Sequence, residues 1–284
     1  MTAYEPIAAP GSELNSHDFK RVAAFIEQHS GIKTPPSKRL LVEGRLRRRA
    51  RASGFASVAD YCEHVFADPA TLATEAELLV NALTTNKTDF FREPKHFDYL
   101  TARVLPALVA AGERRLRVWS AGCSTGAEPY TLAMLLDAFA QERGGPDFGI
   151  LATDLDTDVL AVARRGIFPR AAVEPVPPLL QQRYVLRPTA PGRDEVRIAP
   201  ALRAAIGFAA LNLMDDHYPV GAPMDMIFCR NVLIYFDRET QEKVVRRLLA
   251  NLRSGGHLFL GHSESIADLD LPLTLVGNTI FRRH

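Results

Sequence analysis

The stretch that decides the fold of this chain is Val118-Trp119-Ser120-Ala121-Gly122-Cys123-Ser124-Thr125-Gly126-Ala127-Glu128-Pro129-Tyr130. Apolar residues at 116 and 118 predict a strand, and apolar residues at 132, 135, 136 and 139 recur at helical spacing. Gly122 and Gly126 therefore lie in a turn between a strand and a helix. At the carboxyl ends of strands in an α/β sheet, such a turn lets the backbone approach a ligand. We interpret the stretch as a ligand-binding turn.

Four kinds of site share a turn of this form. Residues 122–126 match the Gly-x-Ser-x-Gly elbow of α/β-hydrolases. They also approximate a dinucleotide loop, although Cys123 and Ser124 break the Gly-x-Gly-x-x-Gly pattern. A P-loop is the weakest match because no Lys-Ser/Thr pair follows Gly126. A loop for S-adenosylmethionine needs glycines but no pyrophosphate motif. A hydrolase is disfavoured because no His-Gly-Gly loop precedes the strand and Ser124 follows the first core strand.

The composition is that of an ordinary globular protein. Of 284 residues, 47% are hydrophobic and 24% are charged, and the formal net charge of +1 argues against a dedicated nucleic-acid-binding protein. Three widely separated cysteines exclude a disulfide framework and fit a reducing compartment. Without a signal peptide or an apolar run of about 18 residues, we expect a cytoplasmic protein with no membrane insertion. No cluster has metal-ligand spacing, so we expect no metal.

The chain divides into four predicted segments, one of which carries an insertion. They are a flexible lead (1–14), an N-terminal helical domain (15–85), a linker that contributes to the site (86–93) and a sheet domain (94–284) with an inserted β-subdomain (167–204). The helical domain carries four predicted helices. Ser16 caps the first helix, and the second runs from Ser37 to Gly54. Ser57 caps the third, and the fourth follows Asp68-Pro69.

The second predicted helix has an unusual charge. Eight basic residues lie between positions 33 and 51 against one acid, Glu43, which leaves seven positive charges. So many like charges repel one another and indicate an acidic partner. No aromatic residue lies among them to stack on bases, so an acidic protein surface is a better match than RNA or DNA. The candidate docking residues are Arg45, Arg47, Arg48, Arg49 and Arg51.

From residue 115 onward, strand and helix patterns alternate. The alternation predicts a parallel, doubly wound sheet. A final strand pair separated by Gly277-Asn278 predicts a hairpin that places one antiparallel strand in the sheet. In the insertion, the prolines at 169, 175, 177, 178, 188 and 191 disfavour a long helix, and 184–187 and 195–198 read as two short strands.

Polar residues follow successive predicted strands. Asp154 and Asp156 end the second strand, where one carboxylate suits hydrogen bonds to ribose hydroxyls and one could cap the following helix. Asn212 follows the next strand and could read an adenine edge, while Arg230 and Asn231 follow the one after it. These side chains should meet in one crevice.

Six motifs are distributed along the chain: Asn-x-Thr-x-Phe-Phe-Arg-Glu (86–93), the glycine stretch (121–131), Ala-Thr-Asp (152–154), Asn-Leu (212–213), Phe-Cys-Arg-Asn-Val-x-Ile-Tyr-Phe (228–236) and Gly-His-Ser-Glu (261–264). With these motifs, the chain resembles CheR-type chemotaxis receptor methyltransferases. It covers essentially the whole chain. It implies a Rossmann-like class I methyltransferase sheet whose last strand is antiparallel, with an N-terminal helical domain and an inserted small antiparallel β-subdomain.

The resemblance also implies the activity and the site. It implies methyl transfer from S-adenosylmethionine to glutamate side chains of a chemoreceptor's cytoplasmic helices, with S-adenosylhomocysteine as product. Arg92 and Tyr235 are implied nearest the transferred methyl. The residues implied to bind the cofactor are Asn86, Thr88, Arg92, Ala121, Gly122, Glu128, Asp154, Asn212, Leu213, Arg230 and Asn231.

Partners follow from the same resemblance. The basic helix is expected to dock the Glu-rich receptor helices, and the β-subdomain could add a receptor C-terminal peptide as a strand. We expect a monomer that binds no nucleic acid. Two alternatives stay open from the residues alone: a nucleic-acid methyltransferase that uses the basic helix on phosphates, and a non-catalytic regulator that binds S-adenosylmethionine.

Overall fold

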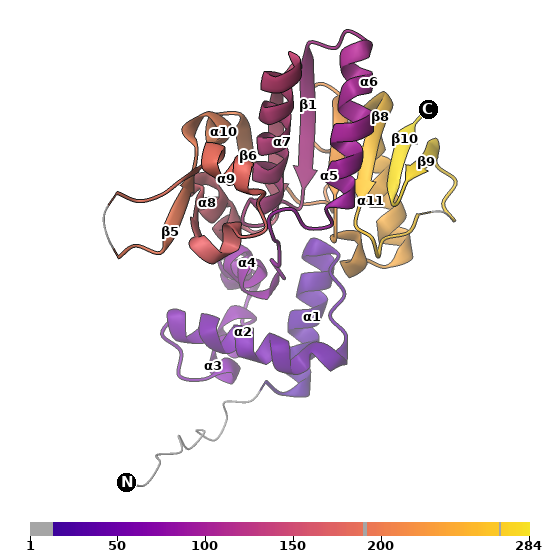
Figure 1. The fold of residues 1–284 in the computed structure, drawn as a ribbon. Coiled ribbons are helices and arrows are strands. Elements are labelled where there is room, and N and C mark those ends of the chain that lie inside the picture. The colour runs from indigo at the N-terminus through magenta and orange to yellow at the C-terminus, as the bar shows by residue number, and fades with distance from the viewer. Residues whose placement is uncertain (1–13, 190–191, 267) are drawn as a thin grey trace. The chain divides into compact units, whose positions relative to one another are not determined.

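The structure is a computed structural model that describes residues 14–189, 192–266 and 268–284. The predicted flexible lead therefore lies outside the described residues, apart from Leu14. The chain forms two compact units, Met1–Thr85 and Asn86–His284, which are described separately below. Figure 1 gives the element labels.

The first unit is all helical. Its helices are α1 (Ser16–Ser30), a 3-10 turn η1 (Pro36–Lys38), α2 (Arg39–Ala52), α3 (Val58–Val65) and α4 (Pro69–Leu83). Side chains of Asn15, Ser57 and Asp68 accept hydrogen bonds from the first-turn backbone N–H groups of α1, α3 and α4. The prediction of Ser16 as the first cap is wrong by one residue, because Asn15 has the extended backbone that a cap requires. A buried cluster that includes Leu46, Tyr61, Val65 and Leu79 holds the helices together.

The second unit is built on a seven-stranded sheet in the order β6-β2-β1-β7-β8-β10-β9. Its strands are β1 (Arg115–Ala121), β2 (Asp147–Asp154), β6 (Ile206–Ala210), β7 (Met224–Cys229), β8 (Leu252–Leu260), β9 (Leu273–Gly277) and β10 (Ile280–Arg283). The five strands from β6 to β8 are parallel, and β10 is antiparallel to both of its neighbours. The predicted fold class is confirmed.

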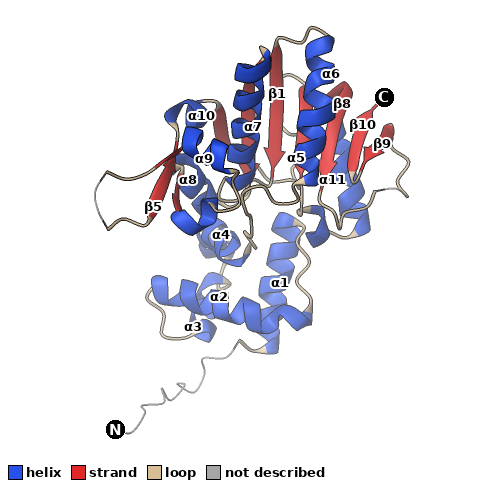
Figure 2. Ribbon diagram, viewed as in Figure 1, coloured by secondary structure: helices blue, strands red, loops and turns tan. Residues whose placement is uncertain are grey.

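Helices flank this sheet, as Figure 2 shows in blue against the red strands. They are α7 (Ala127–Arg143), α8 (Thr157–Arg165), α11 (Arg238–Ala250) and a continuous helix composed of α5 (Lys95–Tyr99), a π-helical turn η2 (Leu100–Val104) and α6 (Leu105–Ala110). Every residue of β7 is buried, as expected for a central parallel strand covered on both faces. Phe228 and Phe259 stack with ring centroids 4.1 Å apart inside this core.

The insertion contains a small sheet in the order β3-β5-β4, with antiparallel pairing throughout. Its strands are β3 (Ile167–Pro169), β4 (Val185–Leu186) and β5 (Glu195–Ile198), together with η3 (Arg170–Val173), α9 (Pro178–Tyr184) and α10 (Pro200–Ala204). As predicted, the described part of the insertion has no long helix, but Pro178 and Pro200 begin two short ones, since they occupy first-turn positions that need no N–H donor. Among the described residues, the longest helices lack the length and apolarity needed to cross a bilayer.

Candidate functional site

The candidate site lies at the carboxyl ends of the parallel strands of the large sheet. The parallel pairing of β1, β2, β6, β7 and β8 brings these ends together on one side of the sheet, at the arrowhead of β1 in Figure 1. Four of the five described non-glycine residues with a left-handed backbone belong to this side of the sheet or to the segment before α5: Phe91, Glu93, Ser124 and Asn231. Strained backbone of this kind clusters at functional sites, where the surrounding structure maintains it.

The glycine turn follows β1, as predicted. Gly122 has φ +80°, and an added Cβ there would lie 2.4 Å from Val232 Cγ2. Gly126 has φ +95°, and an added Cβ would lie 2.9 Å from the Cβ of Ala163. Both glycines are therefore required by backbone conformation and by close packing of the chain itself.

Ser124 has no features of a nucleophile. Its N–H donates to Asp154 Oδ2 at 2.7 Å, and its hydroxyl donates to the Asn86 carbonyl at 2.8 Å. The adjacent Cys123 is buried, and burial raises the pKa of its thiol well above the ordinary value. Both side chains hold the turn in place. This structural role agrees with the prediction that the chain is not a serine hydrolase.

The structure separates the roles of the two acidic residues after β2. Asp156 is buried, caps α8 through the N–H groups of Asp158 and Val159, and accepts from Asn86 Nδ2 at 2.6 Å. Asp154 accepts from Ser124 N and from Asp156 N at 3.0 Å. Burial raises the pKa of Asp154 above its ordinary value. Further donors, such as ribose hydroxyls, would stabilise its ionised form, so Asp154 is the better candidate for that contact.

Arg230, at the end of β7, links several predicted residues. Its side chain is only 2% exposed and donates to Glu128 Oε2 and to Glu93 Oε2, each at 3.0 Å. It also donates to the Arg92 carbonyl. Glu128, in the first turn of α7, accepts from Ser120 Oγ at 2.7 Å through its other oxygen. One buried ion-pair network therefore joins the predicted residues Arg230 and Glu128 to Glu93 and to the Arg92 backbone.

Glu93 is central to this network, although its role was not predicted from the sequence. Besides Arg230, its carboxylate accepts from Asn231 Nδ2 at 3.1 Å and lies 3.3 Å from the backbone N of His262. Burial by itself would raise the pKa of Glu93, but Asn231 and Arg230 outweigh it and lower that pKa below the ordinary value. The signal in the sequence was the density of polar residues between 86 and 93.

A second carboxylate, Glu264, shapes the loop that carries Tyr235. Glu264 is buried and accepts from the backbone N–H groups of Gly261, Asn231 and Ile234. Burial raises the pKa of Glu264 above its ordinary value. The carboxylate thereby ties the residues after β8 to the 3-10 turn η4 (Leu233–Tyr235), where Tyr235 is half-buried.

The remaining predicted residues of this unit lie on the same segments. Arg92 is half-buried, and its Nη1 donates to the Lys87 carbonyl at 3.0 Å. Asn212 accepts from Met214 N at 3.0 Å through Oδ1, which forms a tight turn after β6. Three other predicted residues are half-buried or buried: Thr88 is half-buried, whereas Leu213 and Ala121 are buried.

The predicted docking arginines belong to α2 in the first unit, and they differ in their contacts. Arg45 donates to the Leu83 and Thr84 carbonyls at the end of α4. Arg49 pairs with Glu75 at 2.7 Å, and both side chains are less than one fifth exposed. Arg47 pairs with Glu43 one turn away. Arg48 and Arg51 are exposed and form no ion pair among the described residues, so they remain available to a partner.

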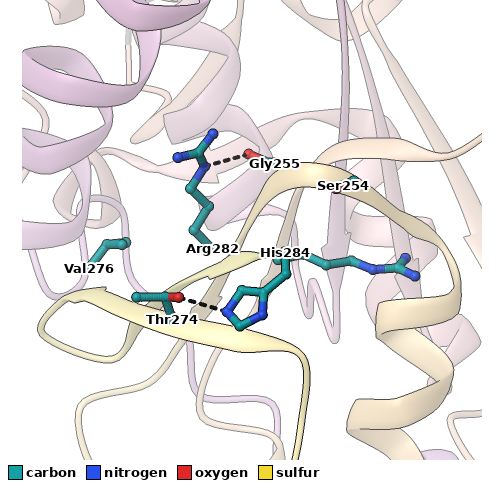
Figure 3. A pocket seen from close by; sticks show the side chains of 7 residues that line it. Ser254, Gly255, Thr274, Val276, Arg282 and His284 are labelled. Carbon is teal, nitrogen blue, oxygen red and sulfur yellow. Dashed lines mark hydrogen bonds between the residues drawn. The ribbon is translucent and has the colours of Figure 1, made fainter.

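A hollow of about 470 Å³ lies elsewhere in the second unit, at the start of β8 (Figure 3). It is lined by residues of β8, β9 and β10. The Arg282 guanidinium donates to the Gly255 carbonyl at 3.4 Å, and Thr274 Oγ1 lies 2.7 Å from His284 Nε2. No predicted site residue lines it, so it does not belong to the candidate site.

Comparison with known proteins covers both units. Residues 17–84 match the family model of the CheR methyltransferase all-alpha domain, and residues 86–281 match that of the CheR methyltransferase SAM binding domain. The chain is 39% identical over 264 residues to chemotaxis protein methyltransferase 2 of Pseudomonas aeruginosa, covering 93% of this chain and 92% of the relative. It is 39% identical over 269 residues to the chemotaxis protein methyltransferase of Escherichia coli, covering 94% and 91%.

Proposed function

This chain belongs to the CheR methyltransferase family, and we propose that it transfers a methyl group from S-adenosylmethionine to glutamate side chains on the cytoplasmic helices of a chemoreceptor. The resemblance inferred from the motifs is confirmed, and so is the assignment to S-adenosylmethionine-dependent methylation in chemotaxis. The glutamyl methyl ester product, the site residues and the docking surface are our proposals.

The observation that carries the cofactor assignment is one contact between the segments that follow β1 and β2. Asp154, after β2, accepts from the N–H of Ser124, in the glycine turn after β1. An acidic group beside a glycine turn suits the ribose hydroxyls of a nucleoside ligand. Glu93, Glu128 and Glu264 add carboxylates around Arg230 and Asn231, which favours a positively charged sulfonium.

The donor set fits the cofactor chemically. Asp154 would hold the ribose, and Asn212 with Leu213 would contact the adenine. The remaining part of the cofactor would contact the backbone of Ala121 and Gly122. It would also contact the side chains of Thr88, Arg92, Glu128, Arg230 and Asn231. Asn86 would support the site indirectly, since its amide donates to Asp156, the cap of α8. When bound, S-adenosylmethionine supplies an electrophilic methyl group on a sulfonium.

The chain's contribution to catalysis is alignment and exclusion of water. A glutamate with pKa of about 4.3 is ionised at neutral pH, so it attacks without a general base. Arg92 would orient this carboxylate by a charge-assisted hydrogen bond, and Tyr235 would donate a neutral one. Positioning both reactants and removing water from two opposite charges lowers the barrier. No metal is required for this chemistry.

Substrate docking is proposed for the exposed part of the basic helix. Arg48 and Arg51 would face acidic receptor helices, while Arg45 and Arg49 link α2 to α4 and Arg47 pairs with Glu43 on α2 itself. Such docking should weaken with salt. In the second unit, β4 is an edge strand of the small sheet and could pair with a receptor C-terminal peptide. We propose a cytoplasmic monomer.

The proposal is tested by incubating the chain with methyl-labelled S-adenosylmethionine and receptor-rich membranes. Label that appears on receptor protein and is released by alkali supports glutamyl esters. Alkali-stable label, or label on nucleic acid, overturns the proposal. Asp154→Asn serves as the matched negative control, and Asp158→Asn, an exposed substitution on the next helix, serves as the positive one.

A further inference from the structure

Three side chains that commonly bind metals meet between the start of α5 and the end of β8: Glu93, His96 and His262. One ligand atom from each lies within 4.8 Å of the others. Glu93 Oε2 is 3.6 Å from His96 Nδ1 and 3.9 Å from His262 Nε2. In a tetrahedral site with bonds of about 2.0–2.2 Å, ligand atoms lie about 3.3–3.6 Å apart. Small rotations of the side chains would therefore complete such a site.

His96 has the orientation of a metal-binding histidine. Its ring is fully buried, and Nε2 lies 3.0 Å from the Asn278 carbonyl oxygen. Because a carbonyl only accepts, Nε2 must carry the proton in this contact. Nδ1 of the neutral ring then presents a lone pair, and this buried atom forms no hydrogen bond among the described residues. A backbone carbonyl that holds the second ring nitrogen is the usual outer contact of a metal-bound histidine.

The lone pair of His96 Nδ1 faces a carboxylate oxygen, which is also electron-rich. Two such atoms at 3.6 Å are brought together favourably by a cation that both can bind. A proton shared by His96 and Glu93 would also bring these two atoms together, but it would leave the nearby His262 without a role. His262 supplies a second nitrogen near the same oxygen, so three ligand atoms lie close enough together for one cation with three protein ligands.

The surrounding charge permits a divalent cation. Arg230 pairs with Glu93 at 3.0 Å, but Glu128 pairs with Arg230 at the same distance. Two carboxylates against one guanidinium leave one negative charge next to two histidines. The side chain of His262 is about one third exposed, which provides an entry path and room for a water ligand at the fourth position.

We propose that Glu93, His96 and His262 form a binding site for a divalent transition metal that prefers nitrogen and oxygen ligands, the class to which Zn²⁺ belongs. Such an ion would tie the start of α5 to the loop after β8. Glu93 Oε2 also accepts from Arg230, so metal binding would compete with this ion pair. We expect this competition to lower the affinity for the cofactor. That expectation rests on the proposed function, whereas metal binding itself does not.

The site is tested with tag-free protein by titration with Zn²⁺ and by the absorption spectrum of bound Co²⁺. We expect one Zn²⁺ per chain and a four-coordinate Co²⁺ spectrum. His262→Ala removes one ligand but keeps the backbone N–H, so it should weaken Zn²⁺ binding by more than about tenfold, because even outer contacts of metal ligands contribute about 10- to 100-fold. His17→Ala, which removes an exposed histidine of α1, should leave binding unchanged.

Equal Zn²⁺ affinity in His262→Ala and the unaltered chain would overturn the proposal, as would a six-coordinate Co²⁺ spectrum. A second measurement is S-adenosylhomocysteine affinity with and without Zn²⁺. Linkage requires that each ligand change the affinity of the other by the same factor. Zn²⁺ binding without this coupling would support the metal site but refute its effect on cofactor affinity. Failure of methyl transfer alone would contradict the proposed function and would change neither the Zn²⁺ affinity nor the coupling.

Discussion

Arg230 and Glu93 form a buried ion pair at 3.0 Å that connects the end of β7 to the segment preceding α5. The two residues are separated by 137 positions in the chain. Breaking a buried pair leaves an uncompensated charge, which costs more free energy than the pair contributes. The pair therefore fixes the backbone of Arg92 relative to the strand ends, since Arg230 also donates to the Arg92 carbonyl.

Glu93→Gln should weaken cofactor binding. The substitution keeps the side-chain size but removes one of the two carboxylate charges paired with Arg230, and we expect S-adenosylhomocysteine affinity to fall by about 1.4 kcal/mol or more, a tenfold loss. Isothermal titration measures this change. Glu242→Gln, which removes an exposed pair with Arg246 on α11, should change the free energy of unfolding by less than about 0.5 kcal/mol and leave affinity intact. Equal effects of the two substitutions would refute a positioning role for Glu93.

Arg92→Ala and Tyr235→Phe should reduce turnover with the fold retained. We expect a decrease in kcat of about 10²-fold for Arg92→Ala, the scale reported for removal of one transition-state donor, and a smaller one for Tyr235→Phe. Steady-state kinetics and circular dichroism separate lost chemistry from lost structure. Unchanged methyl transfer in both variants would remove these residues from the mechanism.

The arginines of α2 should fall into two classes. Reversing the exposed pair, Arg48→Glu with Arg51→Glu, should reduce receptor methylation while the free energy of unfolding stays within about 1 kcal/mol. Arg49→Ala should destabilise the first unit, because it leaves Glu75, which also accepts from the Tyr61 hydroxyl, without its half-buried guanidinium partner. Denaturant unfolding and methylation assays at two salt concentrations measure both effects. Docking through Arg48 and Arg51 is contradicted if their reversal leaves methylation and its salt dependence unchanged.

Stability should decrease on acidification through His96. Burial, followed by the charge of Arg230, lowers the pKa of His96 from 6.5 to about 4, although Glu93 opposes this shift. Between these values the unfolded chain binds more protons than the folded one, so stability rises with pH from about 4 to 6.5 and is lost as pH falls through that window. The contribution to the free energy of unfolding is at most about 3.4 kcal/mol.

Denaturant unfolding at pH 7 and pH 5 measures this effect. His96→Gln should reduce the difference between the two pH values, whereas His17→Gln should not. A pH dependence that is identical in His96→Gln and the unaltered chain would show that His96 does not titrate in this window.

Much of the fold follows from local patterns. The strand, turn and helix around Gly122 and Gly126 could be predicted because periodicity and capping depend on neighbouring residues. The helices of the insertion were missed because short proline-started helices have no full apolar repeat. The cap of α1 shifted to Asn15, since adjacent cap-forming residues cannot be distinguished without backbone angles.

The site was predictable only where a motif carried it. Without the resemblance, the residues left open which of Asp154 and Asp156 caps the helix, because the contact of Asp156 with Asn86 spans 70 positions. Glu93 and the histidines at 96 and 262 were missed for the same reason: the hairpin and the strand order bring them together. Arg45 and Arg49 were grouped with the exposed arginines because charge alone does not reveal a partner on another helix.

The central claim is that the acceptor is a glutamate carboxylate of a chemoreceptor. The most direct measurement is mass spectrometry of receptor peptides after reaction with S-adenosylmethionine and this chain. We predict that individual glutamates gain one methyl group, that mild alkali removes it as methanol, and that Asp154→Asn abolishes the gain. A methyl group on lysine, arginine or nucleic acid, stable to alkali, would contradict the account.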